Sequence, residues 1–75
     1  MRIEVDREAD AAYIRLSDVA LEPGRQTFEL DTPAGIAGTV TMDWKDGKIV
    51  GLEVVGASAL LPDDLLARAV ISEES

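Results

Sequence analysis

The fold is decided by the stretch Thr39-Val-Thr-Met-Asp-Trp-Lys-Asp-Gly-Lys-Ile-Val-Gly-Leu-Glu-Val-Val55. Apolar and polar residues alternate along both of its halves, and the pair Asp46-Gly47 separates them. An Asp-Gly pair between two alternating runs is the strongest short-range signal for a β-hairpin. The stretch therefore predicts two antiparallel strands joined by a tight turn, and it predicts no chemistry.

The length of the turn decides which residues of this hairpin face each other. A two-residue loop would set Val40 opposite Glu53, which mixes apolar and charged side chains on one face. A three-residue loop that also includes Lys45 sets Val40 opposite Leu52 and makes each face chemically uniform. We therefore expect the three-residue loop, with a bulge in which Gly47 takes a positive φ.

The N-terminal part of the chain contains two more alternating runs, which predict a second hairpin. Pairing Val5 with Ala12 sets Ile3 against Ile14 and joins the two apolar sets across the intervening loop. A continuous helix over residues 6–16 is the rival interpretation, because the first half of that segment is rich in helix formers. The strict alternation favours a strand, with at most one helical turn before it.

The rest of the chain adds one strand and one helix. Residues 25–31 alternate again and predict a strand, and Gly51 and Gly56 flank the last strand, where they permit a bulge or a close approach of backbone. A helix of roughly nine residues begins at Leu61-Pro62-Asp63-Asp64, since proline and acidic residues suit a first helical turn. Its apolar side consists of Leu65, Leu66, Ala69 and Val70.

These elements predict an α+β fold. It consists of an antiparallel β-meander of four to five strands with one C-terminal helix packed on the apolar face of the sheet. We expect a single domain over residues 1–71 and a polar tail over residues 72–75, and the order of the strands stays open. Alternation leaves the other face of the sheet open and polar.

The composition narrows the range of functions. The 75 residues include no cysteine and no histidine, so the chain lacks a thiolate nucleophile, a zinc-thiolate site and the commonest general base. No catalytic constellation, cofactor-binding motif or metal-ligand spacing stands out, and we expect a noncatalytic protein without a cofactor. The biochemical function itself stays unknown at this stage.

Charge and size indicate the kind of partner. A net charge of -8 repels phosphate backbones and anionic lipid, so we expect neither nucleic acid nor a membrane as partner, although a basic protein would suit the surface. A domain this small buries only about 60% of its unfolded surface and has no disulfide or metal to support it, which favours a homo-oligomer, with a dimer the favoured form. The N-terminal segment is charged where a secretory signal would be apolar, so we expect a cytoplasmic protein.

Two blocks of the sequence resemble the DUF2283 family of small bacterial and archaeal domains of unknown function, and together they span about two thirds of the chain. The first block is Ile3-Glu-Val-Asp6, Glu8-Ala-Asp10-Ala and Tyr13-Ile-Arg-Leu16, and the second is Asp43, Asp46-Gly-Lys-Ile-Val-Gly-Leu-Glu53 and Ala57-Ser58. The resemblance implies a sheet-plus-helix fold and no settled activity.

The chain departs from the usual pattern of this family at two places. Residues 19–38 are longer and richer in proline and glycine, and Leu52 replaces the more usual isoleucine. These changes affect loops and one core position. Some members of the family look as though they travel with small toxin-like partners, so the resemblance also implies an antitoxin-like, partner-masking role.

The open face of the sheet is the candidate interaction surface. Its residues are Tyr13, Arg15, Ile49, Glu53 and Val55. Our first hypothesis is a self-associating interaction or regulatory module that uses this face or an edge strand. The alternative is a small-molecule or cation-binding domain that uses the acids near Asp43 and Glu53.

Two groups of acidic residues have a simpler explanation than catalysis or metal binding. Asp6, Glu8 and Asp10 alternate like the start of a calcium loop, but a glycine and a glutamate that such a loop requires are missing, so we expect them to cap turns. Asp43 and Asp46 lie near the hairpin tip, where exposure to solvent would deprive them of the desolvation that general acid and base catalysis needs. We expect both to shape the turn.

Overall fold

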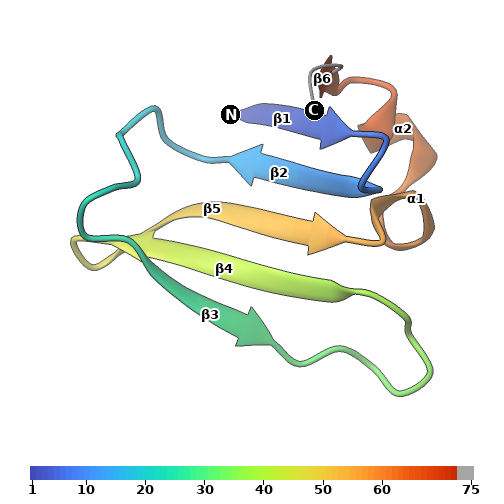
Figure 1. Cartoon of the computed structure of the whole chain (residues 1–75), viewed down its shortest axis with the longest axis horizontal. Coiled ribbons are helices and arrows are strands. Elements are labelled where there is room, and N and C mark those ends of the chain that lie inside the picture. Colours follow the sequence, from blue (N-terminus) through green and yellow to red (C-terminus); the bar gives the residue numbers. More distant parts are fainter. Residues whose placement is uncertain (73–75) are drawn as a thin grey trace.

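The computed structural model describes residues 1–72 and places six strands in one sheet, with two short helices at one end of it (Figure 1). The elements are β1 (Arg2–Asp6), β2 (Ala11–Arg15), β3 (Gln26–Leu30), β4 (Thr39–Lys45), β5 (Lys48–Val55), α1 (Ala57–Leu60), α2 (Asp63–Leu66) and β6 (Val70–Ser72). The predicted α+β fold class is confirmed.

The strand order, which the sequence leaves open, is β3-β4-β5-β2-β1-β6. Strands β3, β4 and β5 form an antiparallel meander, and the β1–β2 hairpin joins it through the antiparallel pair of β2 and β5. The link between β2 and β3 therefore crosses to the far edge of the sheet (Figure 1). Strand β6 pairs in parallel with β1 at the other edge.

The N-terminal hairpin has the predicted register. Val5 pairs with Ala12, and Ile3 pairs with Ile14. Residues 6–16 contain a four-residue turn followed by β2, so the rival helix does not form. Alternation outweighs helix propensity here because pairing places two apolar side chains of each strand on one face.

The central hairpin corrects the predicted turn. Lys45 pairs with Lys48, so the loop has two residues, and Asp46 and Gly47 both have positive φ, at 53° and 77°. This geometry is that of a type I′ turn, which matches the twist of the flanking strands. The expected three-residue loop, and with it the pairing of Val40 with Leu52, is wrong.

A β-bulge removes the conflict that made the two-residue loop look unfavourable. Trp44 pairs with Ile49 and Asp43 pairs with Gly51, so Val50 is an extra residue in β5. Beyond this point the register is displaced, and Met42 faces Leu52. Each face of the hairpin is thus chemically uniform, and the bulge lies next to a glycine, as the sequence predicts.

The C-terminal segment differs from the single helix that we expected. It forms two four-residue helices, α1 and α2, and Val70 begins β6 instead of ending a helix. Pro62 has no N–H to donate to α1, and Leu61 before it is extended, with φ -103° and ψ 146°. The acidic first turn, Asp63 and Asp64, does begin α2.

The expected polar tail is also corrected in part. Ser72 belongs to β6, where it pairs with Asp6 of β1. The remaining residues of that segment, 73–75, lie outside the described residues.

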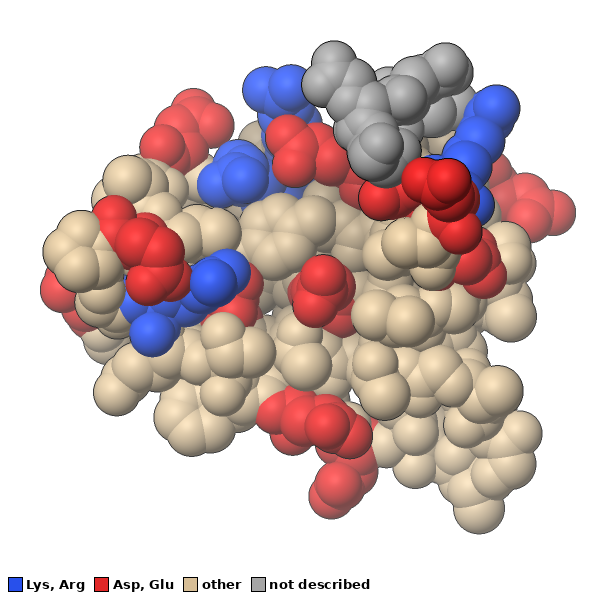
Figure 2. Space-filling view, viewed as in Figure 1, with Lys and Arg blue, Asp and Glu red and all other residues tan. Residues whose placement is uncertain are grey.

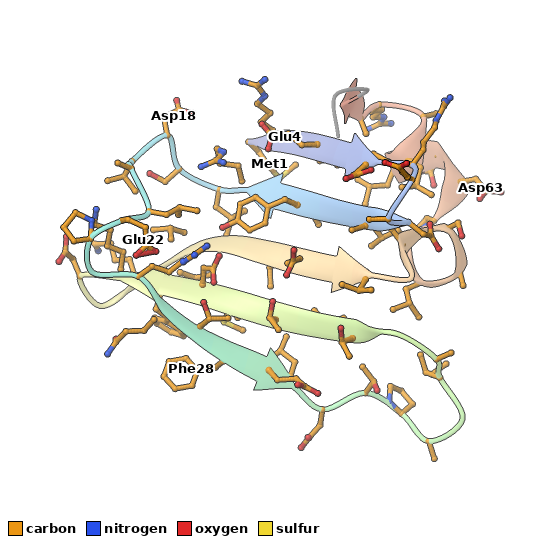
Figure 3. The ribbon with its side chains drawn as sticks, viewed as in Figure 1. Met1, Glu4, Asp18, Glu22, Phe28 and Asp63 are labelled. Atoms are coloured by element: carbon orange, nitrogen blue, oxygen red, sulfur yellow. The ribbon has the colours of Figure 1, made fainter. Side chains whose placement is uncertain are left out.

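A small cluster of buried apolar residues lies at the helical end of the sheet. Ala57 of α1 packs against Ala12 and Val54, with Leu60 and Leu61 beside them. The helical segment therefore packs on the apolar face, as predicted, but it covers one end of that face only. Away from it, Phe28 on the edge strand β3 is 56% exposed (Figure 3).

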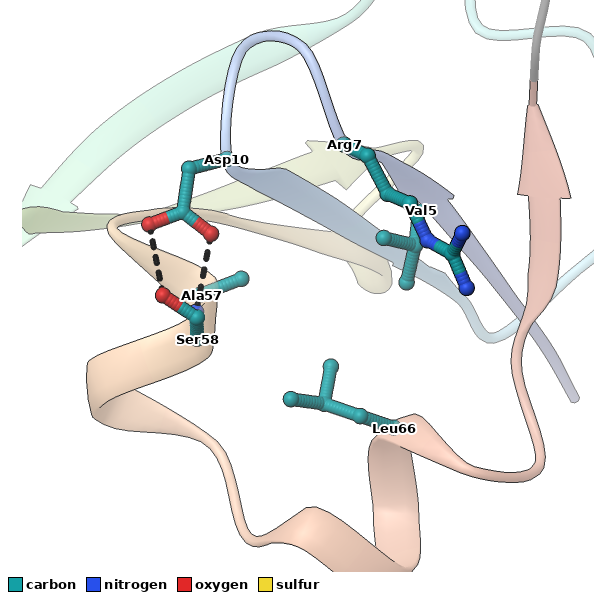
Figure 4. A pocket seen from close by; sticks show the side chains of 6 residues that line it. All are labelled: Val5, Arg7, Asp10, Ala57, Ser58 and Leu66. Carbon is teal, nitrogen blue, oxygen red and sulfur yellow. Dashed lines mark hydrogen bonds between the residues drawn. The ribbon is translucent and has the colours of Figure 1, made fainter.

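Asp10 ties the helical segment to the N-terminal hairpin. Its carbonyl oxygen accepts hydrogen bonds from the backbone N–H groups of Gly56 and Ala57, at 2.8 and 2.9 Å. Its carboxylate accepts from the N–H and the hydroxyl of Ser58, at 3.0 and 2.9 Å (Figure 4). We call these four bonds the Asp10 clamp, and they satisfy N–H groups at the start of α1 that have no helical partner.

Asp6 has the turn-capping role that the sequence predicts. Its Oδ1 atom accepts hydrogen bonds from the N–H groups of Glu8 and Ala9, at 3.0 and 3.2 Å. The bonds hold the turn between β1 and β2 in the shape that presents Asp10 to α1.

Replacing Asp10 by alanine should lower the free energy of unfolding by about 2 kcal/mol, because the variant loses the carboxylate half of the clamp and strains the positive φ of 51° at this position. Urea unfolding followed by circular dichroism measures the change. Asp10→Gly accepts that φ freely and should lose less. Glu8→Ala is the matched control on the same turn, and a loss for Asp10→Ala no larger than for this control would contradict the clamp.

Candidate functional site

The polar face of the sheet contains a hollow of about 410 Å³. Its walls come from β1 to β5 and from the link between β2 and β3. The lining residues are Glu4, Tyr13, Arg15, Leu21, Arg25, Thr27, Thr41, Asp43 and Glu53. Figure 2 views this side of the molecule, where basic groups gather at one side and an acidic group lies over the middle of the sheet.

Strand register explains why these side chains meet. Tyr13 of β2 faces Glu53 of β5, which in turn faces Thr41 of β4. Thr27 of β3 faces Asp43 of β4 in the same way. Directly paired residues point to the same side of a sheet, so the polar residues of four strands converge on one face.

Asp43 is the centre of the hydrogen bonding in the hollow, and it is 3% exposed. Its Oδ2 atom accepts a hydrogen bond from the Tyr13 hydroxyl at 2.7 Å, and its Oδ1 atom accepts one from the Thr27 hydroxyl at 2.5 Å. The Nη1 atom of Arg25 lies 3.7 Å from Oδ2. A buried carboxylate is tolerated when donors and a positive charge surround it in this way.

Gly51 makes room for Tyr13 above the sheet. A Cβ atom added at residue 51 would overlap the hydroxyl and ring of Tyr13. Only a residue without a side chain therefore lets the ring lie across β5 and reach Asp43. The two roles that the sequence allows for this glycine, a bulge and a close approach, are both present.

The surroundings of Tyr13 hold its proton in place. The pKa of Tyr13 is raised from 10.0 to about 12, first by burial and then by the hydrogen bond to Asp43 and the negative charge of that carboxylate. The Arg15 guanidinium lies 5.2 Å from the ring centroid and opposes this effect. At neutral pH Tyr13 is therefore a hydrogen-bond donor committed to Asp43.

Ion pairs occupy most of the remaining charges around the hollow. Glu4 accepts from Arg2, with Nε to Oε2 at 3.2 Å, and lies 3.8 Å from Arg15 (Figure 3). Arg25 pairs with Glu22, with Nε to Oε2 at 2.9 Å. Among the described side chains, those of residues 1–69, Glu53 has no ion-pair or hydrogen-bond partner, so its carboxylate is available to a ligand.

The arrangement is suited to binding. Tyr13 already donates to Asp43, and no described side chain of the hollow forms the nucleophile and base pair of a covalent catalyst. Among residues 1–72, no three acidic side chains converge closely enough to hold a metal ion. What the hollow offers a ligand is a free carboxylate, threonine hydroxyls and the partly paired guanidinium of Arg15.

The structure brings together three of the five surface residues that the sequence predicts. Tyr13, Arg15 and Glu53 all line the hollow. Val55 is 41% exposed and pairs with Ala11 and Thr39, beyond the lining residues.

Ile49 does not belong to this surface. It pairs with Trp44, on the apolar side, because the bulge at Val50 reverses the alternation that the sequence suggests. The prediction that placed Ile49 on the open face is therefore wrong.

Sequence reasoning missed the centre of the hollow. We expected Asp43 to be an exposed residue of the turn, and it is buried by Tyr13, Thr27 and Arg25. The strand register could have indicated this burial. Asp43 faces Gly51, which has no side chain, so the ring of Tyr13 can extend across β5 and cover Asp43. Arg25 begins the alternating run of residues 25–31, which puts it on the same face as Thr27, but the sequence does not show that its side chain reaches Asp43.

By its fold and its hollow, the chain is a small α+β domain with a largely antiparallel sheet and a polar hollow on the open face of that sheet. A family described as "Protein of unknown function (DUF2283)" matches residues 2–58, and the chain belongs to this family. The match covers β1 to β5 and ends at Ser58, the last residue of the Asp10 clamp. No curated protein and no solved structure matches the chain.

Each of the two helices has four residues. Within the described part of the chain, none of them is long and apolar enough to cross a membrane.

The titration of Tyr13 tests the geometry of the hollow, since the chain has a single tyrosine. Tyrosinate absorbance should show a midpoint near pH 12 in the folded protein and near 10.0 in urea. Because the folded pKa is the higher one, the stabilisation is complete below pH 10 and is lost as the pH rises towards 12. Tyr13→Phe should lose less stability across that window, and a folded midpoint near 10 would show that Tyr13 is not buried against Asp43 in the way the hollow requires.

Proposed function

We propose that the protein is a noncatalytic, self-associating interaction or regulatory module, and that a homodimer is its simplest form. The observation that carries this proposal is the incomplete core. Among the residues whose burial is described, five apolar ones are buried, and none of the large side chains is fully buried. A domain of this size without disulfides commonly completes its core by association.

The acidic surface suggests how regulation would work. With a net charge of -8, the protein would attract a basic protein partner and could mask it, as an antitoxin masks a toxin. We propose the cytoplasm as the setting, because the chain contains no cysteine with which to form the disulfides that small secreted domains rely on.

Self-association predicts a mass that depends on concentration. Sedimentation equilibrium should give about 16 kDa at high protein concentration, twice the 8.0 kDa of one chain, and should approach the single-chain mass on dilution. Moderate salt should strengthen the association by screening the like charges of the two copies. A mass of one chain at every concentration would remove the basis of the proposal.

A second candidate function is the binding of a small ligand with a positively charged group in the hollow. Glu53 favours it, because its carboxylate lies between Tyr13 and Thr41 and has no side-chain partner among residues 1–69. Arg15 already pairs with Glu4 and Arg25 with Asp43, so neither arginine compensates the negative charge of Glu53. A primary amine, a guanidinium compound or a cation is the kind of ligand that would complement it.

This candidate predicts thermal stabilisation by a ligand. A panel of small amines, guanidinium compounds and divalent cations should contain one that raises the Tm, since a ligand at a hundred times its Kd stabilises by about 2.7 kcal/mol. Glu53→Gln should abolish the shift, and Glu8→Gln, on the turn outside the hollow, should leave it unchanged. Equal shifts in both variants, or none in the wild type, would eliminate the hollow as the binding site.

A further inference from the structure

The apolar face of the sheet is organised in two rows that run across the strands. The first, which we call the inner row, consists of Val5, Ala12, Val54, Val40 and Leu30, each paired with the next. The second, which we call the outer row, consists of Ile3, Ile14, Leu52, Met42 and Phe28, paired in the same manner. Both rows span the five strands from β1 to β3.

The helices lie over most of the inner row and not over the outer row. The cluster around Ala57 includes four residues of the inner row and none of the outer row. In the outer row Ile3 is buried, at 8% exposed, Ile14, Leu52 and Met42 are partly buried, and Phe28 is 56% exposed. Sheets normally bury an apolar face against a second layer, and the outer row is only partly covered in this way.

The total surface of the chain is larger than that of a compact monomer of this size. The chain exposes 5170 Å², whereas a monomeric protein of 8.0 kDa is expected to expose about 4,450 Å². The excess of about 700 Å² is close to the roughly 800 Å² that each partner buries in a standard interface. The radius of gyration, 12.5 Å, likewise exceeds the roughly 11.3 Å expected for 75 residues.

Charge indicates which partner can fill this place. The polar face carries the carboxylates of Glu4, Asp43 and Glu53 against the guanidinium groups of Arg15 and Arg25, so two copies that met through it would have to remove the unpaired charge of Glu53 from water. The outer row carries no charged residue, so two copies that meet through it bury no charge. A twofold interface brings the same patch of both copies together, and a row of apolar residues can meet its own copy without opposing like charges.

We infer that two copies of this chain pack through their outer rows, sheet against sheet, and form a two-layer sandwich around a shared core. This inference rests on the proposed self-association and names the surface that performs it. Leu52 is the central member of the row, so the twofold axis passes near it, and the two sheets lie about 10 Å apart.

Cysteine cross-linking tests the interface directly, because the natural chain contains no cysteine. Leu52→Cys places a thiol at the centre of the outer row, and the adjacent variant Glu53→Cys places one on the opposite face of the same strand. With a short bis-maleimide reagent, Leu52→Cys should form covalent dimers, and Glu53→Cys should form at most a tenth as many. Circular dichroism confirms that both variants fold.

The possible outcomes separate this inference from the proposed function. If Glu53→Cys cross-links and Leu52→Cys does not, the protein self-associates through its polar face, and the inference fails alone. If neither variant cross-links and the wild type dimerises, an edge strand forms the interface, and the inference again fails alone. A wild type that is monomeric at all concentrations overturns both.

A pair of charge variants provides a second measurement. Phe28→Glu introduces a carboxylate into the outer row at an exposed position, and Val55→Glu does the same on the polar face at a position 41% exposed. We expect Phe28→Glu to raise the dimer dissociation constant at least about tenfold and Val55→Glu to leave it within about twofold of the wild type. The opposite order would overturn the inference.

Discussion

The extra residue in β5 is the constraint on which the rest of the structure depends. The type I′ turn at Asp46-Gly47 fixes one register, and that register by itself would mix apolar and polar side chains on both faces of the hairpin. Val50 displaces the register by one residue and thereby separates the faces. The polar hollow and the apolar outer row are both products of this displacement, because each needs β4 and β5 aligned as they are beyond the bulge.

The two faces differ in how their side chains are stabilised. On the polar face, a buried carboxylate is tolerated because Tyr13, Thr27 and Arg25 surround Asp43 and offset the loss of its hydration. On the apolar face, stability comes from the burial of side chains, which the helices provide only at one end. The buried carboxylate of the polar face therefore finds its partners within the chain, whereas the apolar face is covered only in part.

Sequence patterning predicted the strands well, since period-two alternation follows directly from strand geometry. It placed Val5 against Ala12 and identified residues 39–55 as a hairpin, and both hold in the structure. It failed at the bulge, where the turn and the alternation conflict and only the packed sheet resolves the conflict. It also failed after Pro62, because residues 70–72 pair with the free edge of β1, a contact between distant segments that local periodicity does not report.

The candidate site was predictable only in part, for the same reason. Tyr13, Arg15 and Glu53 alternate on strands and could be assigned to one face, whereas the burial of Asp43 depends on Gly51 from a neighbouring strand and on Arg25 from a link. Contacts of this kind arise from tertiary structure.

The position of β5 beside β2 has a consequence for folding. The residues that pair between these strands lie about forty positions apart in the sequence, and pairing over such separations is slow because the intervening chain must first be brought together. The β1–β2 hairpin leaves the ribosome long before its neighbour does, with an unpaired edge open to other nascent chains. A net charge of -8 on each chain opposes the approach of other copies during that interval.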